Sequence, residues 1–112
     1  MSKDPKIFFE HILENIGYIE EDTTGLQKET FFRDRRLQYL VIRSLEVIGE
    51  AITNIPEETR KKHPEISWRD IMDMRNKLIH EYFGIDEAVV WKTVKENIPV
   101  LKEQIKKILT FK

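Results

Sequence analysis

The chain has 112 residues, of which 40% are apolar and 35% are charged, and it contains no cysteine. Its 19 lysine and arginine residues are balanced by 20 aspartate and glutamate residues, which leaves a net charge of −1. The lack of cysteine excludes a disulfide scaffold, a thiol nucleophile and a thiolate metal site. The length fits one domain, which we expect to span residues 1–112. The high charged fraction favours long amphipathic helices with solvated faces.

No part of the sequence suits a membrane. The apolar runs at residues 7–9 and 39–42 are far shorter than the ~20 apolar residues of a membrane span, and the first residues lack the apolar region of a signal peptide. We therefore expect a soluble, cytoplasmic protein that does not contact the membrane. Basic residues cluster at 33–36 and 60–63, a pattern typical of solvated helix faces, and the near-neutral chain has no overall field that attracts polyanions.

The N-terminal half of the sequence predicts two long helices. An Asp-Pro pair at residues 4–5 is typical of a helix start, and apolar residues follow it at spacings of three and four. Residues 20–25 break this pattern, and the phenylalanines at 31–32 predict a short helical turn. A second apolar stripe predicts the longest helix, which ends before Pro56. Its members are Leu37, Leu40, Val41, Leu45, Ile48, Ala51, Ile52 and Ile55.

The middle of the chain predicts a short helical turn followed by a third long helix. The turn lies in the polar stretch between Pro56 and Pro64, and Ser67 is typical of the residue that caps the start of the next helix. Gly84 is typical of a helix stop. One face of this third helix carries apolar and aromatic residues, namely Ile71, Met74, Leu78 and Tyr82.

The C-terminal region predicts further helix, capped by Asp86 and interrupted at Pro99 by a kink or a new start. The apolar residues expected to face inward before this point are Val89, Val90, Val94 and Ile98, and the apolar pattern continues to the end of the chain with Leu101, Ile105, Ile108 and Leu109. No segment alternates between apolar and polar residues as a strand does. We therefore predict an all-α bundle of four or five helices.

The stretch from Arg75 to Tyr82 carries the most informative polar residues. At 3.6 residues per turn, Arg75 lies nearly in line with Tyr82, and Asn76 nearly in line with His80. Arg75 and His80 are about 140° apart around the helix axis. They converge only if both side chains turn toward one cleft, or if a second copy of the helix supplies the missing partner.

An arginine and a histidine suffice for cleavage of a phosphodiester without a metal. A histidine such as His80 exchanges protons near neutral pH, and a guanidinium such as that of Arg75 stabilises the charge that builds on the phosphoryl oxygens. Asn76 can orient the imidazole or donate to a phosphate. On residue chemistry alone, the favoured interpretation is a surface arginine and a histidine near the end of a helix dipole.

Other catalytic templates are missing from the sequence. It contains no His-Glu-x-x-His pattern, no phosphate-binding loop and no glycine-rich dinucleotide turn. His11 and His63 are isolated in sequence, which is typical of surface or packing residues, and the three histidines have no metal-ligand spacing. We therefore predict no metal site and no cofactor.

Two segments of the sequence resemble HepT-like proteins of the HEPN superfamily. Residues 41–51, which include Ile-Gly-Glu-Ala, resemble the family's second-helix signature. Residues 64–86 combine a Pro-Glu-Ile-x-Trp-Arg lead-in, the Arg-x4-His-x-Tyr motif and Tyr-Phe-Gly. The tail, with Val90-Trp91 and Ile98-Pro99, also fits, so that the resemblance covers nearly the whole chain.

The resemblance implies a HEPN-type helical bundle that forms a homodimer and acts as the toxin of a prokaryotic toxin–antitoxin pair. Such toxins are metal-independent endoribonucleases, with tRNA and mRNA both open as substrates. By position in the motif, Arg75 and His80 match the catalytic pair, and Asn76 matches the polar residue that follows the arginine. The implied partner is a minimal nucleotidyltransferase antitoxin, encoded nearby, that transfers AMP from ATP to Tyr82 and silences the toxin.

Four further positions are interpreted from their place on the second long helix. Glu50 either pairs with Arg75 or is a solvent-facing charge, and Gly49 favours a close approach of two helices. Arg36 and Arg43 are candidate RNA-binding residues if a dimer gathers the basic side chains at one cleft. The alternative function is a non-catalytic helical module that recruits a nucleotidyltransferase to its substrate.

Overall fold

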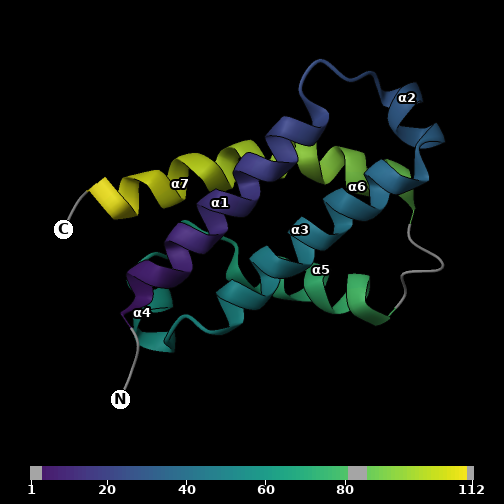
Figure 1. The fold of residues 1–112 in the computed structure, drawn as a ribbon. Coiled ribbons are helices and arrows are strands. Elements are labelled where there is room, and N and C mark those ends of the chain that lie inside the picture. The colour runs from purple at the N-terminus through teal and green to yellow at the C-terminus, as the bar shows by residue number, and fades with distance from the viewer. Residues whose placement is uncertain (1–3, 81–85, 111–112) are drawn as a thin grey trace.

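The structure is a computed structural model that describes residues 4–80 and 86–110. For His80 only the backbone is described. The elements in chain order are α1 (Pro5–Thr23), α2 (Lys28–Arg33), α3 (Arg35–Thr53), α4 (Glu57–Lys61), α5 (Trp68–His80), α6 (Glu87–Lys92), the π-helical segment η2 (Thr93–Asn97) and α7 (Ile98–Thr110) (Figure 1). Residues 4–80 and 86–110 contain no strand, so the predicted all-α fold class is confirmed. None of these helices is long and apolar enough to cross a membrane.

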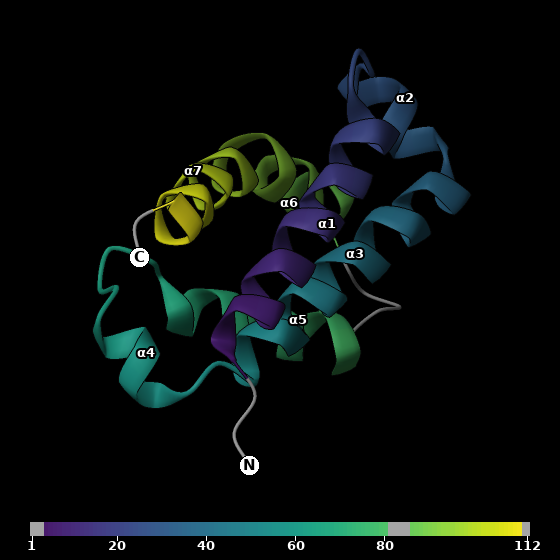
Figure 2. The same cartoon turned by 60° about the vertical axis from the view of Figure 1, so that its left-hand side comes forward.

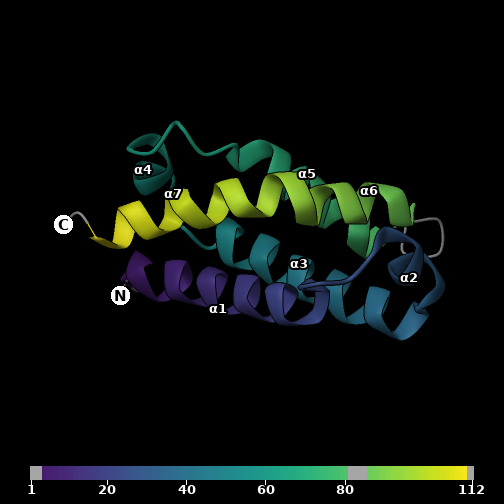
Figure 3. The same cartoon turned by 90° about the horizontal axis from the view of Figure 1, so that it is seen from above.

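The long helices alternate in direction. Seen from above, α1 and α5 run one way, and α3 and the α6–α7 region run back, so that the start of α1 and the end of α7 lie on the same side as α4 (Figure 3). The helix α3 packs against both α1 and α5, and α7 packs against α1. Figures 1 and 2 both show α1 and α3 side by side. Residues far apart in the sequence therefore meet along α3.

Aspartate side chains fix three of the helix starts. An Oδ1 atom of Asp4 accepts a hydrogen bond from the Lys6 backbone N–H at 2.9 Å, and Asp86 accepts one from Ala88 at 2.8 Å. Both caps are as predicted. Asp34 caps α3 in the same way, through the backbone N–H of Leu37 at 3.0 Å. Such caps satisfy donors that the first turn of a helix leaves without partners.

The core lies where α1, α3, α5 and the α6–α7 region meet. Its fully buried side chains are Ile12, Ile16, Ile19, Phe31, Val41, Leu45, Ile48, Ile52, Ile55 and Ile105. Two of the residues predicted to be inside are exposed, Leu40 by 56% and Val89 by 59%. Each precedes a buried valine by one position, and a step of about 100° around a helix carries it past the edge of the packed face.

The predicted interruption at Pro99 takes the form of a wide helical turn. The backbone N–H of Ile98 donates to the carbonyl of Thr93, five residues earlier, and α7 continues from there. Proline has no backbone N–H and its ring crowds the carbonyl four residues before it, so a π turn at this point relieves the clash. The α6–α7 region is therefore one continuous arm that packs on α1.

The arm is tied to α1 by an ion pair. Lys102 Nζ lies 2.8 Å from Glu20 Oε2, and this hydrogen bond to the carboxylate raises the pKa of Lys102 above its ordinary value. Near the other end of the bundle, the Trp68 indole N–H reaches the carbonyls of Arg60 and His63 at 3.0 and 2.9 Å. These bonds hold the α4–α5 connection and so fix where α5 begins.

Candidate active site

Arg75 lies where α5 crosses α3, and Gly49 makes that crossing possible. A Cβ atom added at Gly49 would lie 2.3 Å from Arg75 Cβ and 2.6 Å from its Cγ. Both distances are far below van der Waals contact, and both atoms belong to the rigid root of the arginine side chain. Gly49 therefore allows the close approach of two helices, as its lack of a side chain predicts.

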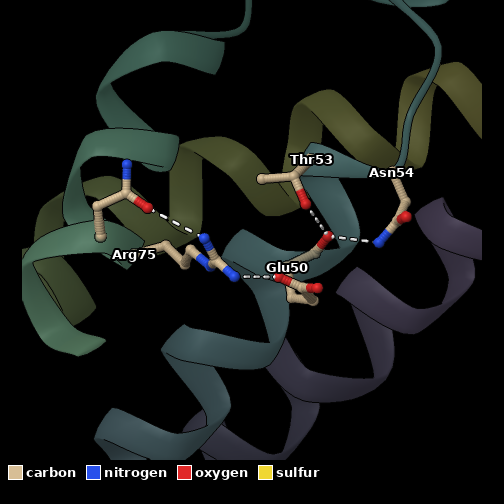
Figure 4. A network of polar contacts seen from close by, with 5 residues as sticks. Glu50, Thr53, Asn54 and Arg75 are labelled. Carbon is tan, nitrogen blue, oxygen red and sulfur yellow. Dashed lines mark hydrogen bonds and ion pairs between the residues drawn. The ribbon is translucent and has the colours of Figure 1, made fainter. Parts of the chain in front are cut away.

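The guanidinium of Arg75 is held by two side-chain acceptors. Its Nη2 donates to Glu50 Oε2 at 2.5 Å, and its Nη1 donates to Asn76 Oδ1 at 3.0 Å (Figure 4). Of the two arrangements considered for Glu50, the structure has the one in which it pairs with Arg75. The Asn76 oxygen contacts the guanidinium as well, so that two of the predicted supporting residues meet at Arg75.

The backbone around Glu50 is itself held in place. Its carbonyl accepts hydrogen bonds from Thr53 Oγ1 at 2.7 Å and from Asn54 Nδ2 at 2.9 Å (Figure 4). These bonds close the last turn of α3, where backbone carbonyls lack partners within the helix. The carboxylate that faces Arg75 therefore projects from a well-anchored turn.

The Glu50–Arg75 pair orients the guanidinium more than it stabilises the fold. The Glu50 side chain is 55% exposed and that of Arg75 is 27% exposed. Ion pairs in contact with water contribute only about 0.2–1 kcal/mol to folding. The Arg75 Nε is buried and finds no hydrogen-bond partner among the described residues, an arrangement that costs stability. A charged group held at some cost beside open space is typical of a functional site.

The open space beside Arg75 is a cavity of about 320 Å³ between α1, α3 and α5. It is lined by Phe8, His11, Arg43, Glu46, Val47, Glu50, Ala51, Asn54, Arg75 and Ile79. The cavity thus brings Arg43, a predicted RNA-binding residue, to the same place as Arg75. Arg36 is exposed on the first turn of α3 and does not line this cavity.

His11 is the residue at this cavity that sequence reasoning missed. It is exposed on α1, and 64 positions separate it from Arg75, so no motif links the two. Only the packing of α1 on α3 brings it to the same place. His80 ends α5, but its side chain lies outside the described residues, and so do Tyr82 and Gly84.

A second hollow lies on the other flank of α5. This groove, of about 480 Å³, separates α5 from η2 and α7. Its polar lining includes Glu65, Asp70, Asp73 and Lys77, with apolar side chains such as Met74 and Val100 between them. Three carboxylates around one ammonium do not suit a polyanion. Within the described parts of the chain, no group of three or more histidine, cysteine or carboxylate residues is placed to hold a metal ion.

Residues 12–108 match the family described as "Ribonuclease HepT-like". The chain belongs to the HepT-like ribonuclease family. The match takes in α3, with Gly49 and Glu50, and the whole of α5. The polar network in Figure 4 therefore lies inside the part of the chain that the family shares.

Curated relatives of this HepT-like chain carry related names. The probable ribonuclease HepT of Thermococcus cleftensis is 50% identical over 108 residues, which cover 96% of this chain and 98% of that protein. A putative RNase of Caldanaerobacter subterraneus subsp. tengcongensis is 44% identical over 107 residues, 96% of each chain. A Methanocaldococcus jannaschii protein named gamma-glutamylcyclotransferase and putative RNase is 49% identical over 109 residues, which cover 97% of this chain and 49% of that one.

No solved structure gives a significant match to this HepT-like chain. The family assignment supports a ribonuclease function for it.

Proposed function

We propose that the chain is an endoribonuclease that cleaves RNA without a metal, with Arg75 and His80 as its catalytic pair. The observation that carries this proposal is the Arg75 guanidinium, held by Glu50 at the rim of an open cavity in a chain of a ribonuclease family. His80 follows five residues later, at the last position of the same helix. Asn76 supports the pair through its hydrogen bond with Arg75.

The proposed reaction is transesterification at a phosphodiester. The ribose 2′-oxygen attacks the phosphorus, the bond from phosphorus to the 5′-oxygen breaks, and the products are a 2′,3′-cyclic phosphate and a 5′-hydroxyl. His80 either takes the proton of the 2′-hydroxyl or supplies a proton to the leaving 5′-oxygen, and water carries out the other of these two proton transfers. Arg75 stabilises the negative charge on the phosphoryl oxygens. The need for a 2′-hydroxyl restricts the substrate to RNA.

A homodimer completes this proposal. Arg75 and His80 are about 140° apart around the axis of α5. They can meet if two copies of α5 face one cleft, so that one copy supplies the arginine and the other the histidine. Tyr39 and Leu40, which are 73% and 56% exposed on α3, provide an apolar surface for such a contact. Sedimentation at micromolar concentration should give a dimer, and a species of 13.5 kDa alone would exclude it.

The same site provides a point of control. In the proposed toxin–antitoxin pair, a nucleotidyltransferase transfers AMP from ATP to the Tyr82 hydroxyl, and pyrophosphate is the leaving group. The added phosphodiester brings bulk and negative charge two positions after His80 in the sequence and so excludes RNA. The substitution Tyr82→Phe removes only the hydroxyl, so the partner cannot modify this variant. Cells that express Tyr82→Phe together with the partner should therefore stop growing. If the partner silences Tyr82→Phe as well as it silences the wild type, this tyrosine is not the control point.

Cleavage by the purified chain tests the catalytic proposal. Single-stranded RNA in excess EDTA should be cut to fragments that end in a 2′,3′-cyclic phosphate, while DNA of the same sequence stays intact. The His80→Ala variant should cut at least about 100-fold more slowly, the usual effect of losing a proton-transfer group. Activity that EDTA abolishes and a divalent ion restores would contradict the mechanism. Full activity in His80→Ala would show that His80 does not transfer the proton, whereas no cleavage by the wild-type chain would favour the non-catalytic binding module.

A further inference from the structure

His11 occupies an unexplained place at the Arg75 cavity. The side chains of His11 and His63 are both described, and their surroundings differ. The His63 ring packs edge-on against Phe9, with 6.5 Å between centroids, and its Nδ1 lies 3.6 Å from Glu65. The His11 imidazole takes part in none of the hydrogen bonds or ion pairs found among the described residues, although the His11 backbone carbonyl accepts one from Asn15. His63 is accounted for by packing, whereas His11 faces the cavity on an exposed turn of α1.

The cavity combines three kinds of side chain. Cationic or proton-donating groups come from three helices, acceptors come from the second half of α3 and its C-cap residue, and the remaining lining is apolar. The donors are His11, Arg43 and Arg75; the acceptors are Glu46, Glu50 and Asn54; the apolar side chains include Phe8, Val47 and Ile79.

This mixture does not suit a free phosphate ion, because two carboxylates face the same space. It does suit a nucleotide. The anionic phosphate of a nucleotide suits the cationic side chains, its hydroxyl and amino groups can donate hydrogen bonds to the carboxylates, and its flat base has an apolar face that suits the apolar side chains. The size agrees, since small-molecule sites begin at about 300 Å³.

Two of the donors remain for a ligand. Glu50 and Asn76 already engage the guanidinium of Arg75. Arg43 is exposed and, like His11, forms no ion pair within the described ranges. A phosphate that enters the cavity therefore meets His11 from α1 and Arg43 from α3 before it reaches Arg75.

We propose that this cavity binds the nucleotide adjoining the cleaved bond, and that His11 and Arg43 hold its phosphate. The proposal rests on the proposed ribonuclease function, because it assigns the neighbouring subsite of the same substrate. His11 thereby contacts the substrate as a binding residue, and the proton transfer stays with His80.

Binding of an RNA that cannot be cut tests the subsite separately from catalysis. The probe is a random-sequence decanucleotide with a 2′-O-methyl group on every ribose, which removes the attacking hydroxyl. For the full chain, His11→Ala should raise the Kd of this probe about tenfold, the effect of losing one hydrogen bond to a charged group. Lys6→Ala is the matched control, because it removes a full positive charge from the same helix outside the cavity. It should change the Kd by less than about twofold.

Cleavage of ordinary RNA by the same variants provides a second readout. His11→Ala should raise KM by a similar factor and leave kcat nearly unchanged, since the residue binds substrate in the ground state and the transition state alike. If the chain binds the probe through His11 but does not cut RNA, the proposed nucleotide site is supported and the proposed ribonuclease function is wrong. If the chain cuts RNA but His11→Ala binds the probe as the wild type does, the subsite is wrong and the ribonuclease stands. Absence of both binding and cleavage overturns both.

Discussion

On one flank of α5, Arg75 and Ile79 face a cavity shared with α1 and α3, whereas on the other flank Asp73 and Lys77 face a groove shared with η2 and α7. The first hollow gathers arginine and histidine side chains from three helices. The second is larger, lined mainly by carboxylates and apolar groups, and unsuited to a polyanion. A net charge of −1 averages over these two flanks, so the balance of the whole sequence does not predict the local charge that a substrate meets.

The two flanks also differ in how closely α5 meets its neighbour. At Gly49 the backbone of α3 lies directly against the root of Arg75. On the groove side, space remains between α5 and the arm formed by η2 and α7. The flank with the tighter contact is the one that carries the polar network, which fits a site whose groups must be held in position.

The largest expected difference between the flanks is in catalysis. Arg75→Ala should slow RNA cleavage about 100-fold or more, because the charge on the phosphoryl oxygens loses its partner. Lys77→Ala removes one cation from the groove flank of the same helix and should have an effect of less than about twofold. Arg75→Lys should lose nearly as much cleavage activity as Arg75→Ala, since an ammonium does not reproduce the planar guanidinium. Equal losses of cleavage rate in the Arg75 and Lys77 variants would show that the rate depends on the total positive charge of α5 and not on the flank that carries it.

The next effect concerns packing, and it compares two glycines within helices. Gly49→Ala should destabilise the fold by about 1–3 kcal/mol, because its new Cβ overlaps Arg75. In α1, a Cβ added at Gly17 would meet no described heavy atom within 4 Å apart from the neighbouring backbone of its own helix, so Gly17→Ala should stabilise the fold by about 0.5–1 kcal/mol through helix propensity. Urea unfolding measures both. The close approach of α3 and α5 would be contradicted by a Gly49→Ala variant as stable as the wild type.

The smallest effect should come from neutralising one carboxylate on each flank. Glu50→Gln keeps the shape of the side chain but weakens its hold on Arg75, so cleavage should fall about fivefold, in line with a partly exposed ion pair. Asp73→Asn, the matched change on the groove flank, should leave the rate within about twofold of the wild type. Steady-state cleavage assays decide between them. If Glu50→Gln speeds cleavage instead, the carboxylate competes with the phosphate for Arg75.

The helices were predictable because their signals are local. The caps at Asp4 and Asp86, the stop before Pro56 and the interruption at Pro99 each depend on a few neighbouring residues, and the structure has all four. Burial was less predictable at the edges of a stripe. Leu40 has the right spacing for the core, but the width of the packed face is decided by the neighbouring helices.

The candidate site was predictable only in part. The motif pointed to Arg75 and Asn76, and the place of Glu50 on the second long helix allowed it to pair with Arg75 without deciding that it does. The crossing at Gly49 settles that question, since it sets the distance between the two helices. His11 could not be found from the sequence, because it reaches the cavity through the packing of α1 alone.

The central claim is that RNA binds on the Arg75 flank of α5, and a pair of introduced cysteines tests it directly. The natural chain has no cysteine, so Ile79→Cys and Lys77→Cys each place one thiol on the same helix, two residues apart and on opposite flanks. Alkylation by iodoacetamide is followed by intact mass with and without the 2′-O-methyl RNA. We predict that the RNA slows alkylation at position 79 several-fold and leaves position 77 unchanged. Protection at position 77 with none at position 79 would contradict the account.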